Sequence, residues 1–473
     1  MTSPDFSGRR VAVAGAAVSG LAVGRVALDR GARVVVVDQR DDESVRAALA
    51  PLLAAGAEAR LGDAESPVDA DLVVTSPGWR PDQPMLVAAQ AAGIEVIGEP
   101  ELAYRMRPWL DGCGPQPWVA ITGTNGKTTT TGMVEAILRA AGHRTVAAGN
   151  VGRPLIEVVL DPDPYDVVAV ELSSFQLHWS SELTPHVGAV LNIAEDHLDW
   201  HGSMEAYVAA KTAVWRRGSE GVYNADDALV ARLAEAALSC PHPFTTGEPA
   251  FGGFGVADGA VIDQMTNGKT DTRLVELADL AVSGPHNVAN AVAAAAATRV
   301  FGLSGGYDVP VGAVGEGLRA YRPGRHRNDV VGQAGGVTWV DDSKATNPHA
   351  AAASLSAYPS VVWIAGGLLK GADVDPLVAE QHHRLRGVVL IGRDRAQIAQ
   401  ALARHAPDVP LVTVVTDETS GMDEAVQAAA ELAQPGDTVL LAPAAASMDM
   451  FRDYAERGDR YAAAVRRIID YLS

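Results

Sequence analysis

The sequence predicts an α/β protein with three domains, and three observations support this. The chain has 473 residues, which is enough for about three domains of ~150 residues. Apolar runs of strand length alternate with helical patterns, as in parallel sheets covered by helices. Two turn-rich stretches, 107–117 and 321–329, interrupt this alternation. We therefore expect domains over residues 1–110, 111–323 and 324–473.

The composition of the chain narrows the classes of function that we expect. The net charge is −20, from 38 basic and 58 acidic side chains, so we expect neither nucleic-acid binding nor attraction to a membrane surface. The apolar stretches, such as 288–297, are too short to span a bilayer. Two cysteines cannot form a disulfide framework or a metal cluster. The first residues contain no apolar core of a signal peptide. We expect a cytoplasmic enzyme that acts as a monomer.

The first segment predicts a Rossmann-like domain. Val11–Ala14 is an apolar strand, Gly15 makes a turn, a helical pattern continues to about Arg30, and a second strand follows at Val34–Val37. A further strand is expected at Leu72–Thr75. This order gives a βαβ unit within a doubly wound sheet.

The loops that follow these strands indicate a nucleotide site. The first turn reads G-A-A-V-S-G, which is close to a dinucleotide fingerprint but has Ala17 at the second glycine. Asp38 follows the second strand, at the position where a carboxylate binds a ribose hydroxyl in such folds. Gly78 lies in the loop after the strand at 72–75. These residues fit a nicotinamide site and the phosphate or sugar of another nucleotide equally well.

Residues 121–132, ITGTNGKTTTTG, predict a phosphate loop. A strand leads into Gly123 and a helical pattern follows, so backbone N–H groups at the helix N-terminus would attract an anion. Lys127 adds a positive charge, and Thr128 is the hydroxyl expected to face Mg²⁺. The loop is shorter than GxxxxGK[ST], which needs a glycine at Ile121. A plain surface turn is the alternative. We expect a central P-loop-type ATPase domain with ATP-binding residues Gly123, Thr124, Asn125, Gly126, Lys127, Thr128 and Thr129.

Polar side chains follow other strands of this segment. Glu171 ends one strand, and EDHLDWH after the next strand contains His197. Mg²⁺ needs few protein ligands beside phosphate oxygens, so Thr128, Glu171 and His197 could hold the ion. Lys211 follows on a helical pattern. A solvated loop whose aspartate caps the Met204 helix is the alternative for EDHLD. For Lys211 taken alone, an exposed helical lysine is the favoured interpretation.

Asparagines stand at the start of a later helix in this segment. The segment predicts strands at Val167–Val170 and Val187–Leu191 and helices at Met204–Trp215 and Asn287–Val300. Asn287 and Asn290 could cap the last helix or read an adenine edge. This stretch alone favours capping.

The third segment predicts a Rossmann-like domain with a parallel sheet. The expected strands are Val337–Val340, Val361–Ala365, Gly387–Ile391, Leu411–Val414 and Thr438–Leu441, with helices at Pro348–Ser356, Ala396–His405 and Met422–Ala433. Lys344 and Thr346 follow the first strand, Lys370 follows the second, and Ser447 stands where we expect a helix to begin. Each loop alone could be a turn or a cap, but together they predict a site for a small anion such as a carboxylate.

These motifs together resemble the Mur ligases. From Val11 to about Tyr461 they run GTNGKTTT, ELSSFQL, LNIAEDHLDWHGS, YVAAK, GPHNVANAVAA, DDSKATNP, GGLLKGAD and LAPAAASMDMF. The DSKATN motif resembles the branch of the family that adds D-glutamate. The resemblance implies an ATP-dependent amide ligase of peptidoglycan synthesis that joins D-glutamate to UDP-MurNAc-L-alanine. The reaction would pass through an acyl phosphate and a tetrahedral intermediate and release ADP and phosphate.

The resemblance also implies residue roles. Lys127 would hold the ATP phosphates, Thr128 and Glu171 would bind one Mg²⁺, and His197 and a carbamylated Lys211 would bind a second. The implied adenosine and phosphate contacts are Asn287, Asn290, Arg327 and Asp342. The implied D-glutamate pocket is Lys344, Thr346, Lys370, Ser447 and Tyr454. The implied uridine and diphosphate contacts are Ser19, Asp38, Arg40, Gly78 and Asn150.

The sequence departs from the family pattern at a few positions. Ala17 stands where a glycine is common, Ala445 replaces a frequent cysteine, and Tyr454 stands where phenylalanine is common. Arg325 takes the place of a proline before the His-Arg pair. None of these changes removes a group with an implied catalytic role.

Other functions compete with this hypothesis. A nicotinamide-dependent oxidoreductase would leave GTNGKT and DDSKATN unexplained. A regulatory protein without catalysis would have replaced Lys127, Glu171, His197 or Lys211, and all four are present. A related ligase with a different amino-acid choice is the nearest alternative.

Overall fold

The computed structural model describes residues 6–216, 218–265, 272–282, 284–304, 306–416 and 419–472, and it confirms the α/β class. The chain divides into two compact units. The first comprises Met1–Ile193, Trp200–Ala281 and Ala289–Tyr321, and the second comprises Ala194–Asp199, Val282–Val288 and Arg322–Ser473. Three large sheets, of five, nine and six strands, fall one within each predicted domain. Among the described residues, no helix is both long and apolar enough to cross a membrane.

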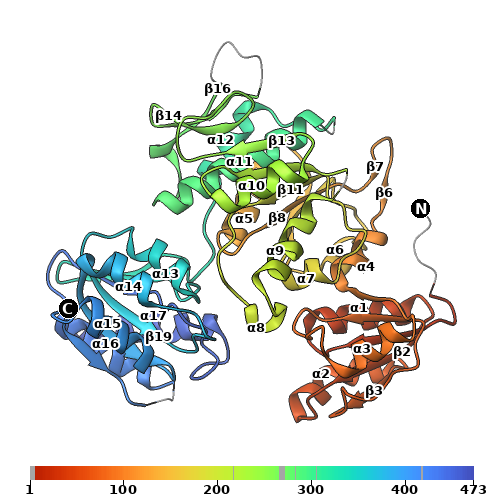
Figure 1. Ribbon diagram of the computed structural model, residues 1–473, viewed down its shortest axis with the longest axis horizontal. Coiled ribbons are helices and arrows are strands. Elements are labelled where there is room, and N and C mark those ends of the chain that lie inside the picture. The colour runs from red at the N-terminus through yellow and green to blue at the C-terminus, as the bar shows by residue number, and fades with distance from the viewer. Residues whose placement is uncertain are drawn as a thin grey trace. The chain divides into compact units, whose positions relative to one another are not determined.

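The first sheet is parallel throughout and has the order β3-β2-β1-β4-β5. Its strands are β1 (Arg10–Ala14), β2 (Arg33–Asp38), β3 (Glu58–Leu61), β4 (Leu72–Thr75) and β5 (Val96–Gly98), and its helices are α1 (Val18–Asp29), α2 (Glu43–Ala54), α3 (Pro84–Ala91) and α4 (Glu99–Arg105). The predicted βαβ unit is confirmed (Figure 1). Strand β1 lies between β2 and β4, so the strand order reverses there, which is where such sheets bind ligands.

The central sheet has the order β16-β15-β14-β13-β12-β11-β8-β10-β9. Its strands are β8 (Trp118–Thr122), β9 (Thr145–Gly149), β10 (Val167–Glu171), β11 (Val187–Val190), β12 (Glu220–Asn224), β13 (Pro241–Phe244), β14 (Phe254–Ala257), β15 (Ala260–Asp263) and β16 (Thr272–Glu276). The helices of this region are α5 (Lys127–Ala140), α6 (Leu155–Val158), α7 (Ser174–His178), α8 (Leu198–His201), α9 (Met204–Thr212), α10 (Ala228–Ala237), α11 (Pro285–Ser304) and α12 (Val311–Ala320), with 3₁₀ turns at Ala213–Trp215 and Leu277–Asp279.

The strands from β12 to β16 were not predicted. β14, β15 and β16 extend the parallel part as an antiparallel edge. Asp258 and Gly259 connect β14 to β15 with φ angles of 47° and 75°. An Asp-Gly pair with positive φ is a strong hairpin signal, so this part of the edge could have been found from the sequence.

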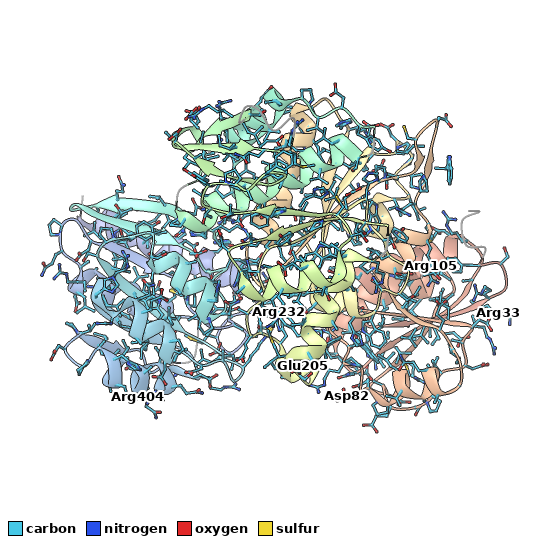
Figure 2. The ribbon with its side chains drawn as sticks, turned by 45° about the horizontal axis from the view of Figure 1, so that its top comes forward. Arg33, Asp82, Arg105, Glu205, Arg232 and Arg404 are labelled. Atoms are coloured by element: carbon cyan, nitrogen blue, oxygen red, sulfur yellow. The ribbon has the colours of Figure 1, made fainter. Side chains whose placement is uncertain are left out.

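The stretch 107–117, predicted as a linker, contains a small antiparallel hairpin of β6 (Trp109–Leu110) and β7 (Gly114–Pro115). Just before it, α4 packs against the central region. Glu101 is fully buried and accepts hydrogen bonds from the backbone N–H groups of Glu182 (3.2 Å) and Leu183 (3.0 Å). Arg105, labelled in Figure 2, pairs with Glu101 at 3.0 Å. The first sheet is therefore attached to the central region by a buried carboxylate.

The second unit contains a six-stranded sheet with the order β17-β18-β22-β19-β20-β21. Its strands are β17 (Asp329–Ala334), β18 (Val337–Asp341), β19 (Val361–Gly366), β20 (Leu385–Ile391), β21 (Leu411–Thr413) and β22 (Thr438–Leu441), and its helices are α13 (Pro348–Leu355), α14 (Asp375–Gln381), α15 (Arg395–His405), α16 (Gly421–Leu432) and α17 (Tyr454–Leu472), with a 3₁₀ turn at His382–Arg384. The predicted parallel sheet is confirmed, except that the edge strand β17 is antiparallel.

Alternate residues of β19 belong to two cores. Val361, Trp363 and Ala365 pack with residues of α13, α14 and α15, whereas Val362 and Ile364 pack with residues of α16 and α17. The helices therefore cover both faces of this sheet, as the blue part of Figure 1 shows. A strand buried on both faces is apolar at every position, which explains its continuous apolar sequence.

Candidate functional site

The loop between β8 and α5 has the geometry of an anion-binding turn. Gly126 has a φ of 81° and directly precedes α5, whose first N–H groups have no partner within the helix. A Cβ at Gly126 would lie 2.4 Å from Oδ1 of Asn290. Only glycine fits here, which accounts for the second glycine of GTNGKT. The predicted strand, turn and helix are confirmed.

Asn192, which follows β11, fixes the shape of this loop. Its backbone carbonyl accepts a hydrogen bond from the N–H of Thr124 at 2.9 Å. Its side chain accepts from the N–H of Asn125 at 2.8 Å and donates to the carbonyl of Asn125 at 3.1 Å. Asn192 was not among the predicted site residues, although its position after an apolar strand was an available signal.

Two lysines donate to the same carbonyl oxygen in the phosphate loop. Nζ of Lys127 lies 2.9 Å from the oxygen of Gly123, and Nζ of Lys211 lies 2.6 Å from it. Lys211 is only 2% exposed, so the interpretation of an exposed helical lysine is wrong. The two ammonium groups therefore lie close together, and like charges at short range repel each other.

Tyr207 lies one helical turn before Lys211 on α9 and is buried. Its hydroxyl lies 2.9 Å from Oγ1 of Thr124, and Nζ of Lys211 lies 4.7 Å from its ring centre. The i, i+4 spacing in YVAAK places both side chains on one helix face, so the sequence contained a signal for Tyr207, which was not among the predicted site residues. The N-cap of α9 is Ser203, which accepts from the N–H of Ala206, so the alternative of an aspartate cap is also wrong.

Glu171 ends β10 and is 1% exposed. Its Oε1 accepts a hydrogen bond from Nδ2 of Asn150 at 2.8 Å. Its Oε2 is buried and has no hydrogen-bond partner among the described residues. A buried carboxylate oxygen without a donor is costly, and it is suited to coordinate a cation. The oxygen donors of Thr128 and Glu171 therefore fit Mg²⁺. Asn150 contacts this carboxylate, and its predicted role toward the UDP substrate stays a prediction.

The expectation that Asn287 or Asn290 caps the helix is wrong. Asn287 and Asn290 both lie inside α11, which begins at Pro285, so neither is an N-cap. Oδ1 of Asn290 instead accepts a hydrogen bond from Oγ1 of Thr130 at 3.2 Å, in the first turn of α5. This places Asn290 beside the phosphate loop. Asn287 is buried.

His197 belongs to the segment Ala194–Asp199, which groups with the second unit. It has a φ of 55°, and its Nε2 lies 3.5 Å from Oδ2 of Asp196. Glu171 and Lys211 belong to the first unit. The predicted metal roles of His197 and Lys211 stay predictions.

In the first sheet, Asp38 holds the glycine turn in place. Its Oδ2 accepts from the N–H of Ala16 at 2.8 Å and its Oδ1 accepts from the N–H of Arg40 at 2.9 Å. Burial acts to raise the pKa of Asp38, but hydrogen bonds from Arg40 and Ala16 outweigh it and lower that pKa below its usual value. Ser19 lies in the first turn of α1, and Gly78 follows β4.

In the second unit, the loop after β18 contains several predicted residues. Burial raises the pKa of Asp342 to about 6, and the neighbouring charge of Asp341 acts in the same direction, whereas Ser354 and Arg327 oppose it. Nζ of Lys344 lies 3.8 Å from the ring centre of Tyr454. Two members of the predicted amino-acid pocket are therefore in contact. Thr346 follows in the same loop.

The loop after β19 and the loop after β22 are hydrogen-bonded to each other. The backbones of Leu368 and Ala446 exchange hydrogen bonds of 2.8 and 2.9 Å. These residues precede Lys370, which has a φ of 55°, and Ser447, which is buried. Ser447 lies in a turn and α17 begins only at Tyr454, so the expectation of a helix N-terminus at Ser447 is wrong.

Comparison with known proteins assigns the family. Profiles described as a Mur ligase MurD-like N-terminal domain, a Mur ligase middle domain, and a Mur ligase, glutamate ligase domain match residues 9–98, 121–298 and 326–445. The chain belongs to the Mur ligase family, which confirms the resemblance seen in the sequence.

Near relatives match over almost the full length. The UDP-N-acetylmuramoylalanine–D-glutamate ligases of Thermobifida fusca and Streptomyces avermitilis are 53% and 52% identical to it, each match covering 98% of this chain and 99% of the relative.

Solved structures of related ligases share the fold. UDP-N-acetylmuramate–alanine ligase from Thermotoga maritima has a TM-score of 0.58 at 19% identity, with 97% of this chain and all of that chain covered. A pseudomurein peptide ligase type C from Methanothermus fervidus has a TM-score of 0.59 at 18% identity, with the same coverage. At this identity the likeness bears on the fold alone.

Proposed function

We propose that this Mur ligase uses ATP to join D-glutamate to UDP-MurNAc-L-alanine in peptidoglycan synthesis. The observation that carries the proposal is the 53% identity, over 98% of the chain, to a relative named for this reaction. The phosphate loop, the buried Glu171 and the polar loops of the second unit support it. We also propose that the protein is a cytoplasmic monomer whose partners are its small-molecule substrates.

The reaction has two chemical steps. The carboxylate of the L-alanyl group attacks the γ-phosphorus of ATP, the bond to the β–γ bridging oxygen breaks, and ADP leaves. The amine of D-glutamate then attacks the acyl phosphate, loses a proton, and expels phosphate from a tetrahedral intermediate. The N–H groups of the turn before α5, together with Lys127, hold the phosphates and stabilise the charge that develops on them.

Thr128 and Glu171 are the proposed ligands of one Mg²⁺, and His197 and Lys211 those of a second. When bound, the ions neutralise charge on the phosphate oxygens. The unpartnered Oε2 of Glu171 supports the first assignment. Asn150 holds the other oxygen of the same carboxylate, and so orients it.

We propose that Lys211 is carbamylated. Its neutral amine would add to the carbon of CO₂ and release a proton, which gives an N-carboxylate. The 2% exposure of Lys211 and the carbonyl that it shares with Lys127 support this. The change replaces one of two neighbouring cations with an anion, which removes their repulsion and supplies oxygen ligands.

The remaining roles follow the sequence analysis. Asn287, Asn290, Arg327 and Asp342 are proposed for the nucleotide, and Ser19, Asp38, Arg40, Gly78 and Asn150 for the UDP substrate. Lys344, Thr346, Lys370, Ser447 and Tyr454 are proposed for D-glutamate. The contact between Lys344 and Tyr454 supports a shared pocket.

Phosphate release from ATP tests the function. With UDP-MurNAc-L-alanine present, we expect release with D-glutamate and not with L-glutamate, L-lysine or meso-diaminopimelate. Release with another of these amino acids instead would keep the ligase chemistry and refute the D-glutamate pocket. No release with any of them would refute the proposed function.

A further inference from the structure

A fully buried arginine links two loops of the second unit. Arg457 lies in the first turn of α17 and has no exposed surface. Its Nε donates to Oγ of Ser343 at 3.0 Å, its Nη2 to the carbonyl of Ser343 at 2.8 Å, and its Nη1 to the carbonyl of Ala445 at 3.0 Å. It forms no salt bridge with any described carboxylate. Burial of a guanidinium is costly, and here the planar fork spans two separate stretches of backbone.

The two stretches are the loops that contain the proposed D-glutamate residues. Ser343 precedes Lys344 in the loop after β18, and Ala445 precedes Ser447 in the loop after β22. Ser343 also donates from Oγ to the carbonyl of Tyr454 at 2.7 Å. The guanidinium therefore fixes the spacing between the backbones on which the pocket side chains stand.

Gly458 follows Arg457 in α17 and leaves room for His326 and Asp341, and Asp341 is the last residue of β18. A Cβ at Gly458 would lie 2.1 Å from Nδ1 of His326 and 2.7 Å from Oδ2 of Asp341. These two atoms lie 2.7 Å apart, and Oδ1 of Asp341 accepts from the N–H of Ser343 at 2.9 Å. One turn of α17 therefore contacts the start of the loop after β18 twice, through Gly458 at Asp341 and through Arg457 at Ser343.

We propose that Arg457 is a positioning residue for the incoming amino acid, which holds the loops of Lys344 and Ser447 at the separation that D-glutamate requires. The inference rests on the proposed function. Arg457 is not proposed to touch the substrate, because its side chain has no exposed surface and each of its three nitrogens already donates to Ser343 or Ala445.

The test is a set of steady-state constants for Arg457→Lys, Arg457→Met and Ser343→Ala. Lysine keeps the charge but cannot reach three acceptors, so both Arg457 variants should raise KM for D-glutamate by about tenfold or more, since hydrogen bonds to a buried charged group are typically worth that much. Ser343→Ala should raise it less. The KM for UDP-MurNAc-L-alanine should stay within about twofold, because its proposed contacts lie in the first unit.

Tyr461→Phe is the matched control. Tyr461 lies one helical turn after Arg457, is fully buried, and donates from its hydroxyl to the carbonyl of Val439 at 3.0 Å. The variant removes a buried hydrogen bond of the same helix without touching either loop. It should lower the melting temperature while leaving KM for D-glutamate unchanged. The double variant Ser343→Ala/Arg457→Met should resemble the Arg457→Met variant alone, because both changes break one network.

The outcomes are distinct. The proposal is supported if the Arg457 variants raise KM for D-glutamate alone and Tyr461→Phe leaves that KM unchanged. An unchanged KM for D-glutamate, or an equal rise in KM for all substrates, overturns it. If the Arg457 variants do not fold, Ser343→Ala decides by the same criterion. If the unaltered enzyme releases no phosphate with D-glutamate, the proposed function fails instead.

Discussion

Glu171 has two carboxylate oxygens in different situations. One accepts a hydrogen bond from Asn150, and the other is buried without a donor among the described residues. Desolvation of such an oxygen costs stability in the free protein, and a bound cation would repay it. Function and stability are therefore opposed at this residue.

Glu171→Gln should separate these two effects. The amide can still accept from Asn150, and it removes the buried charge, so the melting temperature should hold or rise. Phosphate release should fall by about a hundredfold or more and lose its dependence on Mg²⁺. Exposed Glu235→Gln, measured alongside, should leave both quantities unchanged. Activity within about twofold of the unaltered enzyme would exclude the metal role.

Lys211→Ala should abolish ligation. Bicarbonate should not restore activity, because the amine that would react with CO₂ is gone, whereas a short-chain carboxylic acid should restore part of it by occupying the space. NMR after ¹³C-bicarbonate loading should show a carbamate signal in the unaltered protein and none in the variant. Full activity of Lys211→Ala would refute the carbamate.

Asp342 makes stability depend on pH. Its folded pKa of about 6 lies above its ordinary value of 3.8, so this side chain costs no stability below pH 3.8. The cost grows as pH rises from 3.8 to about 6 and is complete above that value. The Asp342→Asn variant should therefore gain stability relative to the unaltered protein at about pH 7.5 and little at about pH 4, as measured by denaturant unfolding. An equal difference in stability between the two proteins at both pH values would contradict the raised pKa of Asp342.

At the scale of elements, short helices and turns determine where the site residues stand. Helix α7 begins three residues after Glu171 and has a capping box: Oγ of Ser173 accepts from the N–H of Gln176, and Oε1 of Gln176 accepts from the N–H of Ser173. A five-residue helix has little intrinsic stability. Its cap therefore stabilises the end of β10 as well as the helix.

Ser173→Ala should lower stability by about 1 kcal/mol, the usual value of an N-cap. The Mg²⁺ concentration needed for half-maximal activity should rise, because the strand end that carries Glu171 loosens. Asp42→Ala removes the N-cap of α2, which accepts from the N–H of Val45, and should cost similar stability without changing the Mg²⁺ requirement. Equal Mg²⁺ responses of the two variants would count against this coupling.

For the whole molecule, the attachment between the first sheet and the central region is the feature open to test. Glu101 provides buried backbone contacts there, and Arg105 divides its charge between Glu101 and the exposed Glu95. Removing a buried acceptor costs more than removing an exposed ion pair.

Glu101→Gln should loosen this attachment, because a neutral amide accepts these N–H groups less strongly and leaves Arg105 without its buried partner. We expect faster limited proteolysis within 107–117 and a broader thermal transition. Glu95→Gln should change neither quantity, since it removes only the exposed ion pair. Equal proteolysis rates for both variants would contradict a structural role for Glu101.

How much the sequence predicted depended on the kind of signal. Strands with continuous apolar runs, such as β4 and β22, were predicted to the residue, because burial on both faces leaves a strong local pattern. The short strands β12, β13 and β16 have no such run, and they were missed. Ser447 was misplaced at a helix start, since a turn and an N-terminus use the same residue types.

The sequence by itself determined the α/β class, the phosphate loop, and the residue types that mark a Mur ligase, because local periodicity and motif chemistry depend on near neighbours in the chain. The tertiary structure decided which of these residues meet. It placed Asn290 against Thr130, Lys211 and Lys127 on one carbonyl, and Arg457 beneath Ser343 and Ala445. These contacts join residues far apart in sequence, and burial, which sets their charge and reactivity, is a property of the folded chain alone.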